Sequence, residues 1–584
     1  MRAKLRDRLR RTEAFLREDG VVWKIALLFA LFEFLSALWD VPSSFGWEND
    51  GIAPRDLFAG VGLNLKLGSA HRYPLFHNLL VALLSLPALL IAVLWGSDFS
   101  ALAIKDRVLS VPCMTSIALV AKVVSVMMAV VTVITVARIA RRTSGPVAGR
   151  LSALCLVCMV TFSFYGRTSN LDVPYLCWSV LALDRLLDIA EHHERRDYVA
   201  FGVLLALAVA TKDQAYAGFM LTAPLFLMLP ILERRGDDRR RSVAHAALSA
   251  AAAGGSYLIL SGAVFNPTGF LARVRLLTGP NSQDWRQYEQ SPTGMLANLK
   301  DIALGQSAQA WSWPLTALAW AGVGLVLLGP RGNGLSRRSL RLLPLCYLVS
   351  HLVFFTLAVG RSEHRFLLPV FAVLAIYAGS AAAALIERIR GERLRQLVAA
   401  GGGLLLLWNL GRVLVISIVG FRDARRPVEE YLAGLPPGTP VETYGHTVYQ
   451  PRFDRAGHNR VTRIDPASSP SSRNPIAGVT EVRAAYGAVA ERRPGVIVVA
   501  GEAAHRLRDA KPTGGRMASV QHTRSTSNAD ARSYFAAIEA DRLPGYKTII
   551  ETGPRVPGWF EKIVPYQIQG TIGGRYRVLV ATGD

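Results

Sequence analysis

Long apolar runs recur along the first 420 residues and are separated by short polar segments. A bilayer crossing takes about 20 apolar residues in a helix. The runs lie at residues 22–39, 76–96, 113–137, 151–166, 173–190, 199–211, 215–232, 243–264, 312–329, 342–359, 367–385 and 397–420. Although several are short for full spans, the pattern predicts a polytopic α-helical membrane protein.

The polar segments between the runs predict which side of the membrane each faces. Basic residues precede residue 22, so the positive-inside rule places the N-terminus in the cytoplasm and the first loop, residues 40–75, outside. Further basic or mixed loops should also be cytoplasmic: residues 138–142, 191–196, 233–241, 337–341 and 387–395. The alternate segments should then lie outside: residues 167–172, 212–213, 266–298, 361–365 and everything after about 421.

This arrangement is inconsistent in one place. With the N-terminus and residue 138 inside and the first loop outside, the runs 76–96 and 113–137 cannot both be single full spans. One of them is re-entrant, divided into two short helices, or not a span. We expect an odd total of about eleven or thirteen helices.

The first run could be mistaken for a signal peptide because a basic segment precedes it. It lacks a small-residue cleavage site, and Glu33 and Asp40 lie in or near it. We therefore predict a retained first helix.

The composition changes after residue 421. Residues 435–440 form a turn signal, residues 496–500, 548–552 and 576–581 have strand patterns, and residues 481–492 have helical character. The sequence thus predicts a transmembrane domain over residues 1–420 and a small extracytoplasmic α/β domain over residues 421–584.

Overall composition agrees with this class. The chain has 584 residues, of which 51% are hydrophobic, and a net charge of +23 that the basic loops largely explain, so we do not expect nucleic-acid binding. All five cysteines lie in or beside apolar runs. Cys155 and Cys158 have CxxC spacing but no second pair, so neither a disulfide framework nor a zinc site is predicted.

The first outer loop joins acids to cations close to the lipid surface, where a carboxylate is costly without a task. Its acids are Glu48, Asp50 and Asp56, followed by Lys66, His71, Arg72 and Tyr73. Folded together, these groups could activate one substrate and bind the phosphate of another. The alternative is a solvated loop with an aromatic and basic belt.

Two other outer segments carry candidate residues. Asp172 is placed as an N-cap before Pro174, while Arg167 could bind a lipid headgroup or a substrate phosphate. Lys212 could simply pair with its neighbour Asp213.

The segment at residues 361–369 is a stronger signal for an anion. If its start is helical, Arg361 and Arg365 share a face, with His364 beside them and Glu363 between. The same residues could anchor a helix at the membrane interface, but we favour a phosphate site.

Together these segments resemble the GT-C membrane glycosyltransferases, most closely family 39, which includes protein O-mannosyltransferases and bacterial aminoarabinose transferases. The resemblance covers the layout of residues 1–420. Two departures stand out: Glu48-Asn49-Asp50 replaces the usual Asp-Glu pair, and Arg361-Ser362 replaces the His-Lys of a related motif.

The resemblance implies transfer of a sugar from a polyprenyl-phosphate donor to an acceptor hydroxyl outside the cytoplasm, with inversion. It makes Asp50 the general base, with Glu48 and Asp56 as alternatives. The groups expected at the donor phosphate are Arg167, Lys212, Arg361, His364, Arg365, Lys66, His71 and Arg72, and those expected at the substrate are Tyr73, Asp172 and Glu363.

No cofactor is required by this scheme, although the first-loop acids could hold a hard divalent cation weakly. The acceptor could be a glycan, a lipid or a protein, and the expected location is the bacterial inner membrane. Two alternatives stay open: a ligase for lipid-linked glycans, and a transporter or flippase. The apolar midspans and the lack of a visible inverted repeat disfavour transport.

Overall fold

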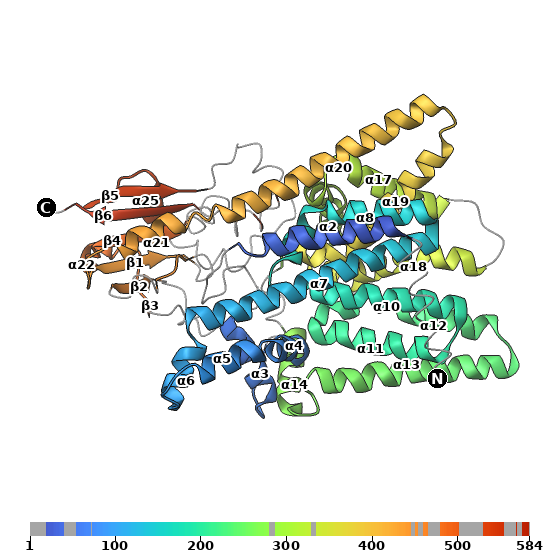
Figure 1. Cartoon of the computed structure of the whole chain (residues 1–584), viewed down its shortest axis with the longest axis horizontal. Coiled ribbons are helices and arrows are strands. Elements are labelled where there is room, and N and C mark those ends of the chain that lie inside the picture. The colour runs from blue at the N-terminus through green and yellow to red at the C-terminus, as the bar shows by residue number, and fades with distance from the viewer. Residues whose placement is uncertain are drawn as a thin grey trace.

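The structure is a helical bundle joined to a small α/β domain (Figure 1). The computed structural model describes residues 19–39, 54–71, 73–279, 286–328, 335–445, 450–453, 459–464, 479–500, 529–553, 564, 568 and 575–582, with the backbone alone for residues 54–56, 335–339 and 529–532.

Twelve of the described helices make up most of the bundle. They are α2 (Gly20–Ser36), α7 (Val111–Ser144), α8 (Pro146–Val157), α9 (Val160–Gly166), α10 (Asp172–His192), α11 (Arg195–Thr211), α12 (Thr222–Glu233), α13 (Gly236–Leu260), α17 (Trp313–Leu328), α18 (Leu335–His351), α19 (Leu368–Arg388) and α20 (Glu392–Phe421).

Shorter helical elements connect them. They are α3 (Pro54–Leu65), α4 (Leu75–Leu84), α5 (Leu86–Leu94), α6 (Ala101–Val108), η1 (Asp213–Gly218), α14 (Pro267–Thr278), α15 (Pro292–Lys300), η3 (Asp301–Gln306), α16 (Ser307–Ala310), η4 (Leu352–Leu357) and η5 (His364–Leu367).

Six spans in the described residues are long and apolar enough to cross a membrane, or up to eight if each of two bent helix pairs forms one span. The helices α2, α10, α11 and α17 pack in the same bundle, but they are short, with 17, 21, 17 and 16 residues, or charged at one end. The predicted class of polytopic helical membrane protein is confirmed.

The inconsistency around residues 76–137 is resolved by a break in the chain. α4 and α5 meet at a bend of 55°, where a proline stands at the start of α5 and interrupts helical hydrogen bonding. α7 then continues unbroken for 34 residues. Residues 76–96 are therefore two short helices, one of the predicted outcomes.

The bundle core is built around α19, most of whose side chains are buried. A Cβ atom on Gly379 would lie 2.2 Å from the Ser152 hydroxyl oxygen and 2.7 Å from the Ala148 carbonyl oxygen, so only glycine allows α8 to approach this closely. Many exposed leucines occur on the flanks of the bundle, for example on α2, α12 and α20, as expected for surfaces that face lipid.

The C-terminal domain is a six-stranded sheet of order β3-β2-β1-β4-β6-β5. The strands are β1 (Pro440–Tyr444), β2 (Arg460–Ile464), β3 (Val479–Val482), β4 (Val496–Ala500), β5 (Tyr546–Thr552) and β6 (Tyr576–Ala581). β3, β2, β1 and β4 pair in parallel, and β6 is antiparallel to both β4 and β5. The helix α21 (Arg426–Ala433) packs on one face and α25 (Ala529–Glu539) on the other.

All three predicted strands are confirmed, but the helix expected over residues 481–492 is wrong. Its first residues belong to β3, where Val482 pairs with Ile464, and only Val489–Arg492 (α22) is helical. Pairing with a neighbouring strand, which sequence does not show, overrides the local helical preference.

The parallel strands point their carboxyl ends back toward the bundle. Thr552, at the end of β5, donates to the Ala424 carbonyl just before α21. Asn459, before β2, instead donates to the Leu432 carbonyl at the far end of α21. Because α21 leads away from α20, the carboxyl edge of the sheet lies on the bundle side.

The centre of the domain holds an ionic and aromatic network. Arg492 donates two hydrogen bonds of 2.8 and 2.6 Å to Glu442, and the Tyr444 hydroxyl also donates to this carboxylate. Burial, followed by the proximity of Tyr534 and Glu442, raises the pKa of Tyr444 well above its ordinary value. This network joins β1, α22 and α25 and stabilises the domain.

Candidate active site

One end of the bundle gathers polar residues from several of the segments that the sequence predicts to lie outside. Lys212, just after α11, lies 2.6 Å from Asp172 at the start of α10. Arg167, just after α9, donates to the Ser417 hydroxyl near the end of α20 at 2.6 Å. Since α20 leads into the α/β domain, this is the end of the bundle that carries that domain (Figure 1).

Three cations surround the ring of Phe366. The Lys212 Nζ atom lies 4.8 Å from the ring centroid, and the guanidinium carbons of Arg361 and Arg365 each lie 4.6 Å from it. Glu363 bridges the two arginines, accepting from each at 2.8 Å. We name these five residues together with Asp172 the Phe366 cluster.

Local backbone geometry builds the cluster from two segments. Residues 361–363 are not helical, Glu363 is extended, and a 3-10 turn follows at η5, so the predicted helical spacing between Arg361 and Arg365 is wrong. The two guanidinium groups meet instead because Glu363 and Phe366 lie between them. Lys212 is likewise extended, with φ of −152°, and this turns its side chain away from the axis of α11.

A glycine fixes the approach to Arg361. Gly360 has φ of +65°, and a Cβ atom there would lie 2.8 Å from the Tyr288 carbonyl oxygen. The amides of Gln287 and Tyr288 both donate to the Gly360 carbonyl, and the Ser362 amide donates to the Gln287 side chain at 3.1 Å. Residues of the segment 266–298 therefore lie directly against the cluster.

The cluster is recessed but not sealed. Side-chain exposure is 11% for Lys212, 16% for Arg361, 7% for Arg365 and 15% for Glu363, while Asp172 is fully buried. Cations in such a site are only partly hydrated, so they interact more strongly with an anion than they would in bulk water. The geometry suits a phosphate with bidentate guanidinium donors.

Two local sequence predictions here are wrong. Asp172 does not act as the N-cap, because its carboxylate binds Lys212, and the Asn170 side chain accepts from the Asp172 amide instead. Lys212 does not pair with Asp213, which binds Arg273 at 3.1 Å. Lys212 therefore pairs with an acid at the end of another helix and not with its neighbour in sequence.

His364 is not part of this gathering of cations. Its ring is buried, with Nε2 2.9 Å from the Gln309 Oε1 atom and Nδ1 3.4 Å from the Thr161 hydroxyl oxygen. Its contacts thus join η5 to α9 and α16 within the bundle.

Arg167 also lies apart from Phe366, in a second buried group. Its Nη1 atom is 3.8 Å from the Glu33 carboxylate of α2, which also accepts from the Ser163 hydroxyl. Glu33 was not predicted as a site residue, although an acid inside the first apolar run was a visible signal.

The first outer loop is described only in part. Glu48, Asp50 and Arg72 lie outside the described residues, and only the backbone of Asp56 is described, in the first turn of α3. Leu57, the next residue, is buried in the same apolar cluster as Leu171. The start of α3 therefore packs into the cluster that holds the residue preceding Asp172.

The later part of this loop is anchored to the bundle. Lys66 is exposed, and its carbonyl accepts from Asn266, the N-cap of α14, at 2.7 Å. The amide of Tyr73 donates to the His71 ring at 3.2 Å. These contacts join the loop to α14 and hold His71 beside Tyr73.

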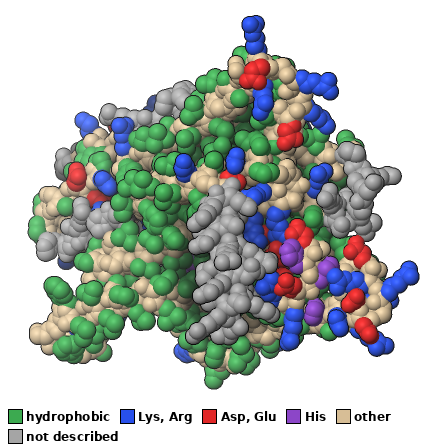
Figure 2. Space-filling view, turned by 45° about the vertical axis from the view of Figure 1, so that its right-hand side comes forward, with side chains coloured by type: hydrophobic (Ala, Val, Ile, Leu, Met, Phe, Trp, Pro, Cys, Tyr) green, Lys and Arg blue, Asp and Glu red, His purple; other side chains and the backbone are tan. Residues whose placement is uncertain are grey.

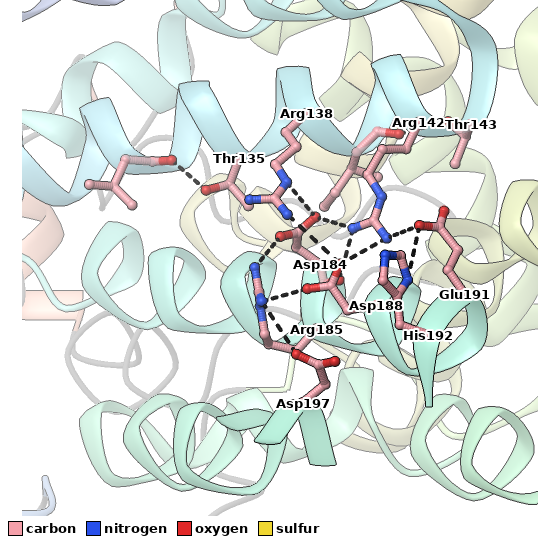
Figure 3. Close-up of polar contacts among 12 residues, drawn as sticks. Thr135, Arg138, Arg142, Thr143, Asp184, Arg185, Asp188, Glu191, His192 and Asp197 are labelled. Atoms are coloured by element: carbon pink, nitrogen blue, oxygen red, sulfur yellow. Dashed lines mark hydrogen bonds and ion pairs between the residues drawn. The ribbon is translucent and has the colours of Figure 1, made fainter. Parts of the chain in front are cut away.

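The opposite end of the bundle has a different set of charges (Figure 3). Arginines of α7 and α10 pair with acids of α10 and α11 at distances of 2.5 to 3.8 Å. We name this set the arginine–aspartate network: Arg138, Arg142, Asp184, Arg185, Asp188, Glu191 and Asp197.

Figure 2 shows charged and histidine side chains gathered on this end of the molecule, beside a flank covered by hydrophobic side chains. No group of three or more histidines, cysteines or acids in the described residues is arranged to hold a metal ion.

Comparison with known proteins gives one family match. Residues 107–259 match the model of the family described as dolichyl-phosphate-mannose-protein mannosyltransferase. The predicted resemblance is confirmed. This stretch includes Arg167, Asp172 and Lys212 but neither the first outer loop nor residues 361–369. A comparison with curated protein sequences finds no match.

Solved structures with a similar arrangement include two that span most of this chain. One is ArnT from Cupriavidus metallidurans bound to undecaprenyl phosphate, with 15% identity, a TM-score of 0.47 and coverage of 85% of this chain and 95% of that chain. Another is the apo Archaeoglobus fulgidus oligosaccharyltransferase, with 10% identity, a TM-score of 0.49 and coverage of 96% and 88%.

The S. cerevisiae Pmt1-Pmt2 complex bound to its sugar donor also matches. It has 16% identity, a TM-score of 0.32 and coverage of 47% of this chain and 36% of that chain.

Proposed function

We propose that this chain is a membrane glycosyltransferase that moves a sugar from a polyprenyl-phosphate donor to an acceptor hydroxyl, with inversion at the anomeric carbon. The reaction site is the bundle end that carries the α/β domain, on the extracytoplasmic side of a bacterial inner membrane. The observation that carries this proposal is the grouping of Lys212, Arg361 and Arg365 around Phe366 at that end. The family match over residues 107–259 supports the same class of donor.

The three cations can stabilise the charge that the reaction produces on its leaving group. When the bond between the anomeric carbon and the phosphate oxygen breaks, negative charge develops on the lipid phosphate. Donors fixed before the reaction stabilise that charge without reorganising. Glu363 and Asp172 hold Arg361, Arg365 and Lys212 in place and so supply this preorganisation.

The reaction also requires a base for the acceptor hydroxyl. The resemblance assigns this role to Asp50, with Glu48 and Asp56 as alternatives in the same loop. The loop begins after Trp39 at the end of α2, and α3 returns Leu57 to the apolar cluster beside Asp172. The described ends of the loop therefore lie at the same end of the bundle as Asp172, which supports a base from this loop.

The α/β domain fits a role in acceptor access. The carboxyl edge of its sheet lies on the bundle side, as the contact between Thr552 and Ala424 indicates. Ligands of α/β sheets commonly bind at that edge. An acceptor held there has its hydroxyl directed toward the Phe366 cluster.

The test is sugar transfer by purified protein in lipid vesicles supplied with a panel of labelled polyprenyl-phosphate sugars. We expect release of polyprenyl phosphate together with a labelled product. Asp50→Asn should lower kcat by about 10²- to 10⁴-fold, the usual contribution of a general base. Glu48→Gln and Asp56→Asn are the matched variants in the same loop. Adding a chelator tests whether transfer depends on a divalent cation.

A substrate-dependent flux without covalent product would replace this proposal with transport. Transfer of long glycans from a polyprenyl diphosphate would replace it with ligation. Normal product formation by Asp50→Asn, with loss in Glu48→Gln or Asp56→Asn, would keep the reaction and move the base.

A further inference from the structure

An ion pair lies inside the bundle at the point where the first outer loop leaves it. Glu33, in the last turn of α2, is fully buried, and Arg167 is 2% exposed. Their closest charged atoms are 3.8 Å apart. Among the described residues, the second Glu33 oxygen and the Arg167 Nε atom have no hydrogen-bond partner, so the pair is incompletely satisfied there.

Such a pair is poorly explained as a source of stability. Removing two charges from water is costly, and a buried pair with unsatisfied atoms often contributes less than well-packed apolar side chains would. Ionisable residues within membrane-spanning helices are rare and commonly mark function. The position of Glu33 and Arg167 therefore requires another reason.

Their neighbours show what the pair joins. Glu33 belongs to α2, whose end leads into the first outer loop. Arg167 begins the segment that leads to Asp172 of the Phe366 cluster. Ser417, which accepts from Arg167 at 2.6 Å, belongs to α20, the helix that carries the α/β domain. One buried group thus connects the three parts of the proposed active site.

A second buried cation holds the end of α2, where the chain leaves the bundle. Lys122 of α7 donates to the carbonyls of Ala37 and Trp39 at 3.3 and 3.1 Å, and its ammonium lies 5.2 Å from the Trp39 ring. The rings of Trp39 and Arg167's neighbour Phe164 are 6.5 Å apart. The last described residue before the loop is therefore held next to the ion pair.

We propose that Glu33 is a positioning residue of the reaction, which acts through Arg167 to hold the end of α2 against the segment that leads to Asp172 of the Phe366 cluster. Arg167 then serves as its internal partner and does not contact the donor phosphate. The inference rests on the proposed function for its kinetic test and on the structure alone for its second test.

The kinetic test compares Glu33→Gln with Asp19→Asn. Asp19 lies at the other end of the same helix, buried, 2.9 Å from Arg150, which makes it a matched control. Glu33→Gln should lower kcat by about 10- to 100-fold with less than a twofold change in KM for the donor, because a small displacement of a catalytic group is sufficient for such a loss. Asp19→Asn should keep its kcat.

The double variant Glu33→Gln with Arg167→Gln separates positioning from direct binding and removes both charges, which protects folding. If Arg167 pairs only with Glu33, the double variant is more active than Arg167→Gln alone. If Arg167 binds the phosphate, the double variant is no better and KM for the donor rises, which overturns the assignment.

Hydrogen–deuterium exchange provides a readout that needs no activity. Glu33→Gln should speed amide exchange at residues 37–39 and in the loop that follows, whereas Asp19→Asn should leave these amides unchanged. Unchanged exchange in Glu33→Gln would remove the positioning role even if the enzyme's reaction proves to be a different one.

Discussion

The two ends of the bundle use charge in different ways, and α10 contributes to both. At one end, Asp172 belongs to the Phe366 cluster. At the other, Asp184 and Asp188 belong to the arginine–aspartate network, about 18 to 24 Å along the helix at 1.5 Å per residue.

The balance of charge differs between these two sets. The network pairs three arginines with four acids through contacts among α7, α10 and α11. The Phe366 cluster has three cations and two acids, and its cations also gather over an aromatic ring. The first arrangement ties helices together, whereas the second gathers three cations around one aromatic ring.

The largest effect expected from this contrast is on stability at the network. Arg142→Met leaves Asp184 and Asp188, both largely buried, without their shortest contacts to α7. Breaking a buried pair on one side costs about 3–5 kcal/mol. The unfolding free energy in detergent should fall by that amount, while kcat of the folded fraction stays close to normal.

Arg240→Gln is the control at the same end, because its contact with Asp237 is almost fully exposed and should contribute little. A large loss of kcat in folded Arg142→Met protein would contradict the structural role of the network.

The next effect is on rate, at the Phe366 cluster. Lys212→Met and Arg365→Met each remove a preorganised donor to the departing phosphate. Loss of one such donor typically lowers kcat by about 10²- to 10³-fold. Initial rates and the melting temperature should be measured together. A variant that loses stability but keeps its rate would place this cluster with the structural set.

A smaller effect is expected at the ring itself. Phe366→Leu keeps an apolar side chain but removes the aromatic face within 5 Å of three cations. Cation–π contacts contribute about 0.5–2 kcal/mol, so KM for the donor should rise by up to about 30-fold. Phe366→Tyr retains the face and should restore most of the affinity, and failure of that rescue would show that packing alone matters.

Sequence patterns predicted the two-part architecture because hydrophobic length and strand alternation are local properties. Residues 496–500 and 576–581 are strands as predicted. The division of residues 76–96 into two helices was only one of several alternatives, because the consequence of a proline depends on what packs around it.

Less of the site than of the fold could be predicted from the sequence. The expected set of phosphate-binding residues contained the Phe366 cations, yet the ring between them and the pairing of Lys212 with Asp172 depend on contacts 40 and 154 residues apart. Arg167 and His364 belong to segments that also contribute residues to the Phe366 cluster, but their own side chains are buried within the bundle. Glu33 was visible only as an acid in an apolar run.

The most direct test is a structure of the protein with polyprenyl phosphate bound. We expect phosphate oxygens within about 3 Å of nitrogen atoms of Lys212, Arg361 or Arg365, the distance of a charge-assisted hydrogen bond. A phosphate bound at the arginine–aspartate network, or held by Arg167 away from Phe366, would contradict it.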